Sequence, residues 1–214
     1  MEMLRITEIF YSLQGESRSI GFPTVFIRLT GCPLRCSYCD TAYAFAGGTR
    51  MSLADIMEQV RSYEPLHVCV TGGEPLAQAD CLVLLKLLAD EGYEVSLETS
   101  GALNVAEVDA RVVKILDIKT PGSGEVGGNL YANIEHLLPQ DQIKFVITGE
   151  EDYQWSKHQL EHYRLSARCE VLFSPALGDT SDVVWLADNI LRDRLPVRFQ
   201  LQLHKILWGN APGK

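Results

Sequence analysis

The chain has 214 residues, of which 46% are hydrophobic and 22% charged, and its formal net charge is −9. This composition is typical of a globular protein with a full core, and it excludes disordered and fibrous classes. An acidic chain repels a phosphate backbone, so we expect no binding to nucleic acid. We find no apolar run of membrane-spanning length and no secretory signal, so we expect a cytoplasmic protein without membrane contact.

Strand-like and helix-like segments follow one another along the chain, and they alternate from about residue 66 onward. Runs rich in Val, Ile and Phe predict strands at 5–12, 24–30, 66–71, 94–99, 112–118, 142–148, 170–175 and 197–203. Helices are predicted at 52–62, 79–90, 104–110, 129–137, 151–165 and 181–193. Ser52 is placed as an N-cap of the first helix, and Gly92 closes the second.

This alternation predicts βαβ units and a largely parallel sheet, which is an α/β fold. A complete eightfold barrel usually needs about 250 residues, so we expect an abbreviated, incomplete (β/α) barrel. We find no repeat or linker, and residues 1–214 are therefore predicted to form one domain. Four predicted strands end in residues suited to chemistry, at 30–40, 72–75, 99–101 and 119–124. Because the carboxyl ends of parallel strands share one rim, we expect a single pocket there.

The most specific motif is "TGCPLRCSYCD" at 30–40, in which Cys32, Cys36 and Cys39 have the spacing C-x3-C-x2-C. Clustered thiols in a reducing compartment are more often ligands than disulfides. A structural zinc site needs four protein ligands, and no nearby His completes this set. Three thiolates suit a [4Fe–4S] cluster that leaves one iron open to a ligand. The scattered Cys69, Cys81 and Cys169 are predicted to be small buried hydrophobic residues.

The cysteine spacing, with Tyr38 before the last cysteine and "GGEP" at 72–75, resembles the radical S-adenosylmethionine (SAM) enzymes. Further stretches resemble the 7-carboxy-7-deazaguanine synthase family of queuosine biosynthesis: "YSLQGES" (11–17), "FIRLTGCPLRCSYCDT" (26–41), "ETSG" (98–101), "DIKTPGSG" (117–124) and "QLHKILWGN" (202–210). The resemblance implies a radical SAM type of incomplete barrel and a lyase that contracts 6-carboxy-5,6,7,8-tetrahydropterin to 7-carboxy-7-deazaguanine with loss of ammonia. It also implies Mg²⁺, an electron donor such as flavodoxin, and a homodimer.

The resemblance further assigns roles to individual residues. Cys32, Cys36 and Cys39 would hold the cluster, and Thr41 would bind Mg²⁺ with Asp40 holding a metal-bound water. The SAM contacts implied are Tyr38, Gly72, Gly73, Glu74, Gly101 and Ser123, with Glu74 accepting from the amino group. The substrate contacts implied are Leu13, Gln14, Gly15, Glu16, Arg28, Thr99 and His204.

Alternatives stay open at several of these positions. Arg28 suits a bidentate contact with the substrate carboxylate, or it is a paired structural arginine. Glu16 either faces the guanidine-like edge of the pterin or is a solvated loop carboxylate. His204 is either functional or structural, and Lys119 either serves the site or forms a strand-end salt bridge.

Two other functions compete with this interpretation. One is another radical SAM enzyme, in particular a glycyl-radical-enzyme activase, which would share both cofactor motifs; "LQGE" and "CDT" argue against it. The other is a non-enzymatic iron–sulfur carrier or structural zinc module, which predicts a fourth ligand that the sequence lacks.

Overall fold

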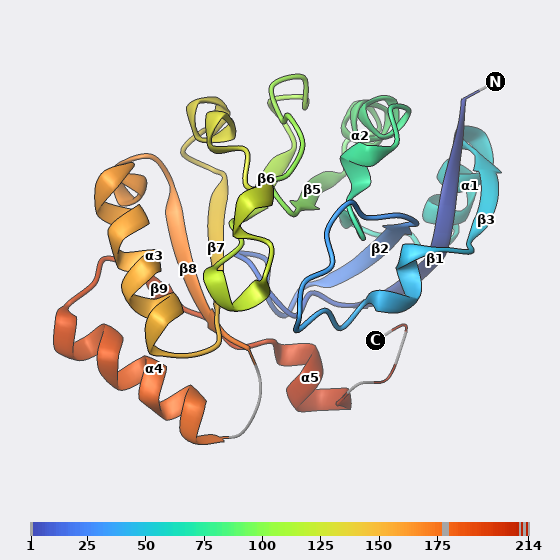
Figure 1. Ribbon diagram of the computed structural model, residues 1–214. Helices are drawn as coiled ribbons and strands as arrows, with labels where there is room; N and C mark the ends of the chain where they lie inside the picture. The colour runs from blue at the N-terminus through green and yellow to red at the C-terminus, as the bar shows by residue number, and fades with distance from the viewer. Residues whose placement is uncertain (1, 177–179, 210, 212, 214) are drawn as a thin grey trace.

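The computed structural model describes residues 2–176, 180–209, 211 and 213. Asn210, at the end of the stretch "QLHKILWGN", lies outside the described residues. The strands of the described part form one nine-stranded sheet in the order β3-β1-β2-β4-β5-β6-β7-β8-β9. Figure 1 shows that this sheet curves into an open half-barrel with β3 and β9 at its edges. The predicted incomplete (β/α) barrel is therefore confirmed.

The strands of the sheet run parallel from β2 to β9, whereas β1 is antiparallel to both of its neighbours, β2 and β3. The strands are β1 (Met3–Leu13), β2 (Pro23–Leu29), β3 (Thr49–Ser52), β4 (His67–Gly72), β5 (Glu94–Thr99), β6 (Val113–Asp117), β7 (Gln142–Ile147), β8 (Glu170–Pro175) and β9 (Arg198–Phe199). The short edge strand β3 was not predicted from the sequence.

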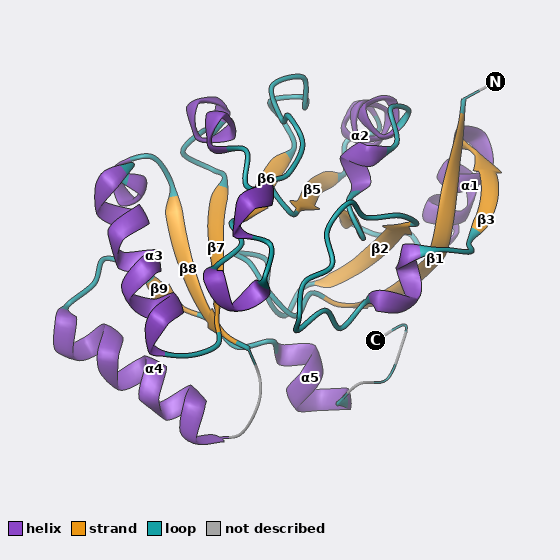
Figure 2. Ribbon diagram, viewed as in Figure 1, coloured by secondary structure: helices purple, strands orange, loops and turns teal. Residues whose placement is uncertain are grey.

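Four helices lie along the outer side of the curved sheet, and a short fifth helix lies apart from them (Figure 2). They are α1 (Leu53–Ser62), α2 (Cys81–Asp90), α3 (Glu150–His162), α4 (Thr180–Asp193) and α5 (Leu203–Trp208). None of these helices is long and apolar enough to cross a bilayer, as far as the described residues extend.

Successive side chains of each strand point to opposite faces of the sheet. In β2, Val25, Ile27 and Leu29 belong to the fully buried core on one face, whereas Phe26 and Arg28 line a cavity on the other. The same alternation in β5 places Leu97 in the core and Glu98 at the cavity. The outer face therefore supplies the hydrophobic core, and the inner face is left for chemistry.

Two helix ends follow the sequence prediction. The hydroxyl of Ser52 accepts a hydrogen bond from the backbone N–H of Asp55 at 3.1 Å, which confirms the N-cap of α1. Gly92 follows α2 with φ of +87°, a left-handed conformation that favours glycine.

The helix predicted at 104–110 is wrong, because this segment forms turns between β5 and β6. The side chains of Asn104 and Asp109 accept hydrogen bonds from the backbone N–H groups two residues further on, at 2.8 and 3.0 Å. Such local side-chain contacts compete with the helical pattern. The segment predicted at 129–137 forms only a 3-10 helix, at Tyr131–His136.

The strand predicted at 197–203 is largely wrong, because β9 covers only Arg198–Phe199 and α5 begins at Leu203. The backbone N–H of Gln200 still donates to Phe173 of β8 at 3.0 Å. The N–H of Leu203 then donates to the carbonyl of Gly15 at 2.9 Å, far from β8 in sequence. The segment "VRFQLQL" therefore alternates like a strand, but after β9 the chain leaves the sheet and turns onto the loop that follows β1.

That loop, residues 14–22, reaches from β1 across the inside of the half-barrel to β7. The backbone N–H of Arg18 donates to the side chain of Gln142 at 3.0 Å, and Glu16 pairs with Lys144 at 2.8 Å. The loop and α5 together cover the inner side that the open sheet leaves exposed.

Candidate active site

A cavity of about 910 Å³ lies at the carboxyl ends of the parallel strands. Its wall combines apolar side chains such as Phe10 and Ile115 with a row of charged ones: Arg28, Glu98, Asp117, Lys119 and Lys144. A completed barrel fills this space with branched apolar residues. The polar wall therefore marks the inner face of this half-barrel as a ligand site.

The three clustered cysteines lie on the loop after β2, and all three line the cavity. Each is half-buried and none forms a disulfide. Hydrogen bonds from Ser37 hold the loop, since its N–H donates to Ser123 at 2.9 Å and its hydroxyl donates to Gly122 at 2.7 Å. Burial raises the pKa of the Cys32 and Cys36 thiols, so iron loading releases protons.

The thiols fit an iron–sulfur cluster better than a single metal ion. Among the described residues, no three His, Cys, Asp or Glu side chains are arranged to hold one ion. In a [4Fe–4S] cluster each thiolate binds a different iron, so the sulfur atoms need to surround a cluster rather than converge on a point. A closed zinc module would need the converging set that is missing from the described part.

The "GGEP" turn at the end of β4 packs directly against the cysteine loop. A Cβ atom on Gly73 would lie 2.3 Å from the carbonyl oxygen of Gly31 and 2.8 Å from Cβ of Cys32. A Cβ atom on Gly72 would lie 2.3 Å from the carbonyl oxygen of Leu29. Both glycines line the cavity, so their backbone groups are accessible beside the thiols.

The Glu74 carboxylate, predicted to accept from the amino group of SAM, is occupied by protein donors in this structure. The side chain is fully buried and does not line the cavity. It accepts hydrogen bonds from the hydroxyl of Thr99, from the N–H and hydroxyl of Ser100, and from the N–H of Leu76. Glu74 therefore ties the end of β4 to the end of β5 and leaves only the backbone of the turn for a ligand.

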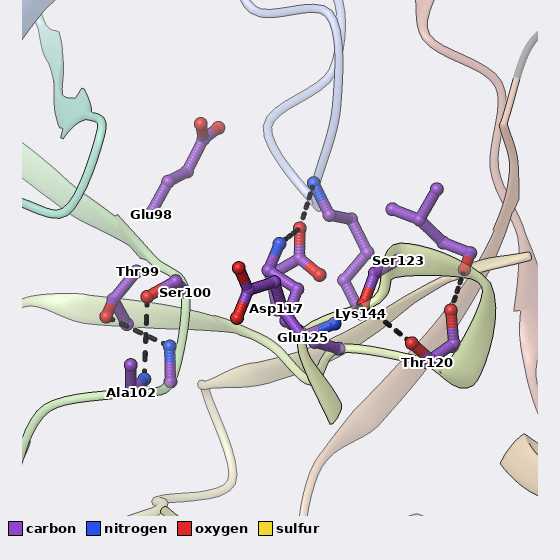
Figure 3. Close-up of polar contacts among 12 residues, drawn as sticks. Glu98, Thr99, Ser100, Ala102, Asp117, Thr120, Ser123, Glu125 and Lys144 are labelled. Atoms are coloured by element: carbon purple, nitrogen blue, oxygen red, sulfur yellow. Dashed lines mark hydrogen bonds and ion pairs between the residues drawn. The ribbon is translucent and has the colours of Figure 1, made fainter. Parts of the chain in front are cut away.

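Thr99 and Tyr38 line the cavity, as predicted for ligand contacts, but Gly101 and Ser123 do not. The Ser123 hydroxyl donates to the carbonyl of Thr120 at 2.6 Å and accepts from the N–H of Glu125 at 3.0 Å. Figure 3 shows these contacts within the loop after β6. Lys119, at the start of this loop, does line the cavity. It pairs with Asp117 at 3.1 Å and so forms the predicted strand-end salt bridge.

Tyr38 lines the cavity, but its polar group is buried. Its hydroxyl is buried and has no hydrogen-bond partner among the described residues. Burial raises the pKa of Tyr38, so the phenol stays protonated. Tyr38 thus lines the cavity while its hydroxyl stays buried and unpaired among the described residues.

Arg28 is both paired and exposed to the cavity. Its Nε atom donates to Oε1 of Glu8 at 2.7 Å, and the same oxygen accepts from the Tyr43 hydroxyl at 2.7 Å. Burial works to lower the pKa of Arg28, but the hydrogen bond with Glu8 and the nearby charges together outweigh it and raise that pKa. The two terminal nitrogens of the guanidinium make no hydrogen bond within the described residues, so a bidentate anion contact remains possible.

The loop after β1 and helix α5 meet over the cavity. A Cβ atom on Gly15 would lie 2.1 Å from Nδ1 of His204, so these residues are in contact only because position 15 is a glycine. Glu16 pairs with Lys144 and also accepts from the amide of Gln202 at 2.8 Å. The alternative of a solvated Glu16 is therefore wrong. Leu13, Gln14, Gly15, Glu16 and His204 all line the cavity.

Asp40 and Thr41 lie between the cysteine loop and α5. The Thr41 hydroxyl donates to Oδ1 of Asp40 at 2.7 Å, and Oδ2 of Asp40 pairs with Lys205 at 2.8 Å. Burial works to raise the pKa of Asp40, but Lys205 lowers it to about 2. A hydroxyl beside an ionised carboxylate is an oxygen-rich pair that suits Mg²⁺ with its waters.

Sequence reasoning missed the charged residues in the middle of the strands. Lys144 lies in β7 among apolar residues, pairs with Glu16 at 2.8 Å, and contacts Asp117 at 3.3 Å. Glu98 lines the cavity from β5. The available signal was a charged residue at the inward position of an otherwise apolar strand, which is costly unless a partner or ligand compensates it.

Comparisons with known proteins agree with this geometry. The family model described as "Radical SAM superfamily" matches residues 26–118, which include the cysteine loop and the "GGEP" turn. The 7-carboxy-7-deazaguanine synthase of Chlorobaculum tepidum is 45% identical over 209 residues, covering 96% of this chain and 94% of that relative. The synthases of Koribacter versatilis and Thermoplasma acidophilum are 42% and 36% identical and cover 96% and 97% of this chain, and 97% and 99% of their own lengths.

Solved structures show the same fold. The crystal structure of QueE from Escherichia coli has a TM-score of 0.78 at 24% identity, covering 94% of this chain and 95% of that one. Streptococcus suis SuiB bound to S-adenosylmethionine has a TM-score of 0.56 at 16% identity, covering 80% of this chain and 45% of that one. At these identities the likeness concerns the fold alone.

Proposed function

The chain belongs to the 7-carboxy-7-deazaguanine synthase family of radical SAM enzymes, and from this premise we propose which residues perform the reaction at its cavity. The enzyme is a radical SAM lyase that converts 6-carboxy-5,6,7,8-tetrahydropterin to 7-carboxy-7-deazaguanine with loss of ammonia. The observation that carries the proposal is the meeting of three free thiols, the Gly72–Gly73 turn and a charged cavity on one rim. A glycyl-radical activase is not favoured, since the relatives named above are synthases.

Cys32, Cys36 and Cys39 would bind a [4Fe–4S] cluster, and the Gly72–Gly73 backbone would bind the amino group of SAM. When bound, the cluster and SAM supply a hydrogen-abstracting radical. Tyr38 would contact SAM from the far side of the cluster loop, and its lining position supports this. For Glu74, Gly101 and Ser123 we propose a supporting role, because their side chains or turns hold the rim without lining the cavity.

Arg28 would bind the carboxylate of the substrate through its two terminal nitrogens, with Glu8 and Tyr43 fixing the plane of the guanidinium. Leu13, Gln14, Gly15, Glu16, Thr99 and His204 would enclose the ring system. The contact between Gly15 and His204 supports a closed arrangement that excludes water around the substrate.

Thr41 would bind Mg²⁺ through its hydroxyl, and Asp40 would hold a metal-bound water. The support is the adjacent hydroxyl–carboxylate pair at the cavity wall.

We also propose that residues 1–214 work as one radical SAM domain, in a cytoplasmic homodimer reduced by a flavodoxin-type donor. The single sheet supports one domain, and the six free cysteines support a reducing compartment. Light scattering during size-exclusion chromatography would measure the subunit number.

One anaerobic reaction tests the function. Iron-reconstituted protein, SAM, a reductant, Mg²⁺ and 6-carboxytetrahydropterin are combined, and the products are analysed by mass spectrometry. A product lighter than the substrate by one ammonia, with SAM largely unconsumed, is expected. SAM cleavage without this product would contradict the substrate assignment and leave another radical SAM reaction.

A further inference from the structure

Glu98 differs from the other carboxylates that line the cavity. Asp40 pairs with Lys205, Glu16 with Lys144, and Asp117 with both Lys119 and Lys144. Glu98 forms no ion pair within the described residues, although it lines the same cavity. Figure 3 shows that its side chain takes no part in the contact between Asp117 and Lys144. It is therefore the lining carboxylate whose charge is still available to a ligand.

Two neutral groups hold Glu98 in place. The Thr71 hydroxyl donates to Oε2 at 3.0 Å, and the Gln14 amide lies 3.4 Å from Oε1. The orientation of Gln14 is set in turn, because its amide oxygen accepts from the N–H of Glu16 at 3.1 Å. Each carboxylate oxygen thus keeps lone pairs for further donors, and its direction is fixed before a ligand arrives.

Glu98 stands at a defined position relative to Arg28. Arg28 of β2 is the backbone partner of Thr71 in β4, and Thr71 donates to Glu98 of β5. Arg28 and Glu98 therefore lie in one row on the inner face, two strand spacings or about 10 Å apart at the backbone. Arg28 is the cation at one end of this row, and Glu98 is the carboxylate without an ion pair at the other end. This arrangement suits a flat ligand that carries an anionic group near Arg28 and two hydrogen-bond donors near Glu98.

We propose that Glu98 is the specificity-determining residue for the pyrimidine end of the substrate, which rests on the function proposed above. The 2-amino-4-oxo ring of a pterin presents two adjacent donors, N3–H and the 2-amino group, and a carboxylate accepts both in parallel. Arg28 then holds the carboxylate at position 6. Glu16, which sequence reasoning favoured for this role, is already occupied by Lys144 and Gln202.

This arrangement selects against ligands that lack the donor pair. A carbonyl oxygen in place of the 2-amino group would face the Glu98 charge and be rejected, because a buried carboxylate left without its donor is costly. Glu98 therefore distinguishes a pterin from a lumazine that has the same 6-carboxylate.

The test is a binding experiment with two stable, fluorescent probes, 6-carboxypterin and 6-carboxylumazine. Each is equilibrated by anaerobic dialysis with cluster-loaded enzyme and SAM, using wild type, Glu98→Gln, Glu98→Asp and the matched variant Glu16→Gln. Wild type is expected to prefer 6-carboxypterin, and Glu98→Gln to weaken its binding roughly 10- to 100-fold while leaving 6-carboxylumazine equal or tighter. Glu98→Asp should retain the preference with weaker binding. Glu16→Gln, which loosens the loop after β1, should weaken both probes alike and so keep the preference for 6-carboxypterin.

The outcomes separate this proposal from the function on which it rests. Equal loss of both probes in Glu98→Gln, or loss of the preference in Glu16→Gln instead, would overturn the role of Glu98 while wild-type turnover still supports the synthase. Wild type that binds neither probe and forms no product would overturn both. Unchanged SAM binding and thermal midpoint in Glu98→Gln establish that the variant is folded.

Discussion

At the scale of single residues, the position of each cysteine predicts whether it binds the cluster or packs in the core. Cys32, Cys36 and Cys39 stand on a loop at the cavity, whereas Cys81 is fully buried at the start of α2. We predict that replacing any loop cysteine with Ala removes the visible absorbance of the reconstituted cluster and leaves the far-ultraviolet circular dichroism unchanged. The matched variant Cys81→Ala should keep the absorbance and lose about 1 kcal/mol of unfolding free energy, because it leaves a small core cavity. Cluster retention in a loop variant would contradict the ligand assignment.

Arg28 carries a second prediction at this scale. Arg28→Ala should lower kcat/KM for the pterin by roughly 10²-fold or more, since a charge-assisted bidentate contact is lost. The affinity for SAM should change little, because Arg28 is held by Glu8 and Tyr43 and is not among the residues proposed to contact SAM. Steady-state kinetics and SAM titration measure the two effects, and Arg50→Ala on the exposed edge strand is the control. Equal losses in substrate and SAM binding would refute a contact specific to the substrate carboxylate.

At the scale of elements, the packing of α5 depends on one glycine. Gly15→Ala would place a methyl group 2.1 Å from His204 Nδ1, so the His204 side chain must shift, or α5 must shift with it. We predict a roughly 10²-fold fall in kcat/KM from misplacement of the enclosing residues, with little change in the thermal midpoint. Hydrogen exchange of Leu203–Trp208 should increase in the variant. Gly127→Ala has no atom within 4 Å of the added methyl group and should match wild type in both measurements.

The elements also show which parts of the fold the sequence could predict. The runs at 24–30, 66–71 and 94–99 are rich in β-forming apolar residues and end at turn residues, so local composition identified β2, β4 and β5. The segments 104–110 and 197–203 failed because their conformation depends on Asn104, Asp109 and the contact of Leu203 with Gly15. The latter joins residues that lie far apart in the chain, and no local pattern encodes it.

The candidate site likewise combines features that are encoded locally in the sequence with features that depend on distant contacts. The cysteine spacing and the "GGEP" turn are local signals, and the structure places the three thiols and both glycines at one cavity. The burial of the Glu74 carboxylate and the pairing of Glu16 with Lys144 could not be predicted, because each joins separate strand ends. Pairing across strands decides which carboxylate is left for a ligand, and that information appears only once the sheet is assembled.

At the scale of the whole molecule, the open half-barrel is held across its inner side by one buried ion pair. Lys144 of β7 and Glu16 of the loop after β1 have side chains only 11% and 13% exposed. Burial works to raise the pKa of Glu16, but the charge of Lys144 and the hydrogen bonds from Lys144 and Gln202 together hold that pKa below its ordinary value of 4.5. Burial alone would lower the pKa of Lys144, but the charges of Glu16 and Asp117 raise it above 10.5. The depressed carboxyl pKa stabilises the fold above about pH 4.5, and this contribution is lost as the pH falls through the folded value.

Lys144→Met should therefore lower the free energy of unfolding at pH 7 by about 3 kcal/mol, because Glu16 is left at the inner face without a cation and Asp117 keeps only Lys119. The loss should shrink below pH 4.5, where protonation of Glu16 already weakens the pair in wild type. The double variant Lys144→Met/Glu16→Gln should lose less than the sum of its single variants, as expected for groups in direct contact. Lys86→Met removes an exposed pair with Asp90 on α2 and serves as the control, with a much smaller change expected. Urea titrations from pH 4 to 8 measure all four variants. A Lys144→Met loss no larger than that of Lys86→Met would mean that the loop and β7 are held together by packing alone, and that the charged inner wall serves ligand binding only.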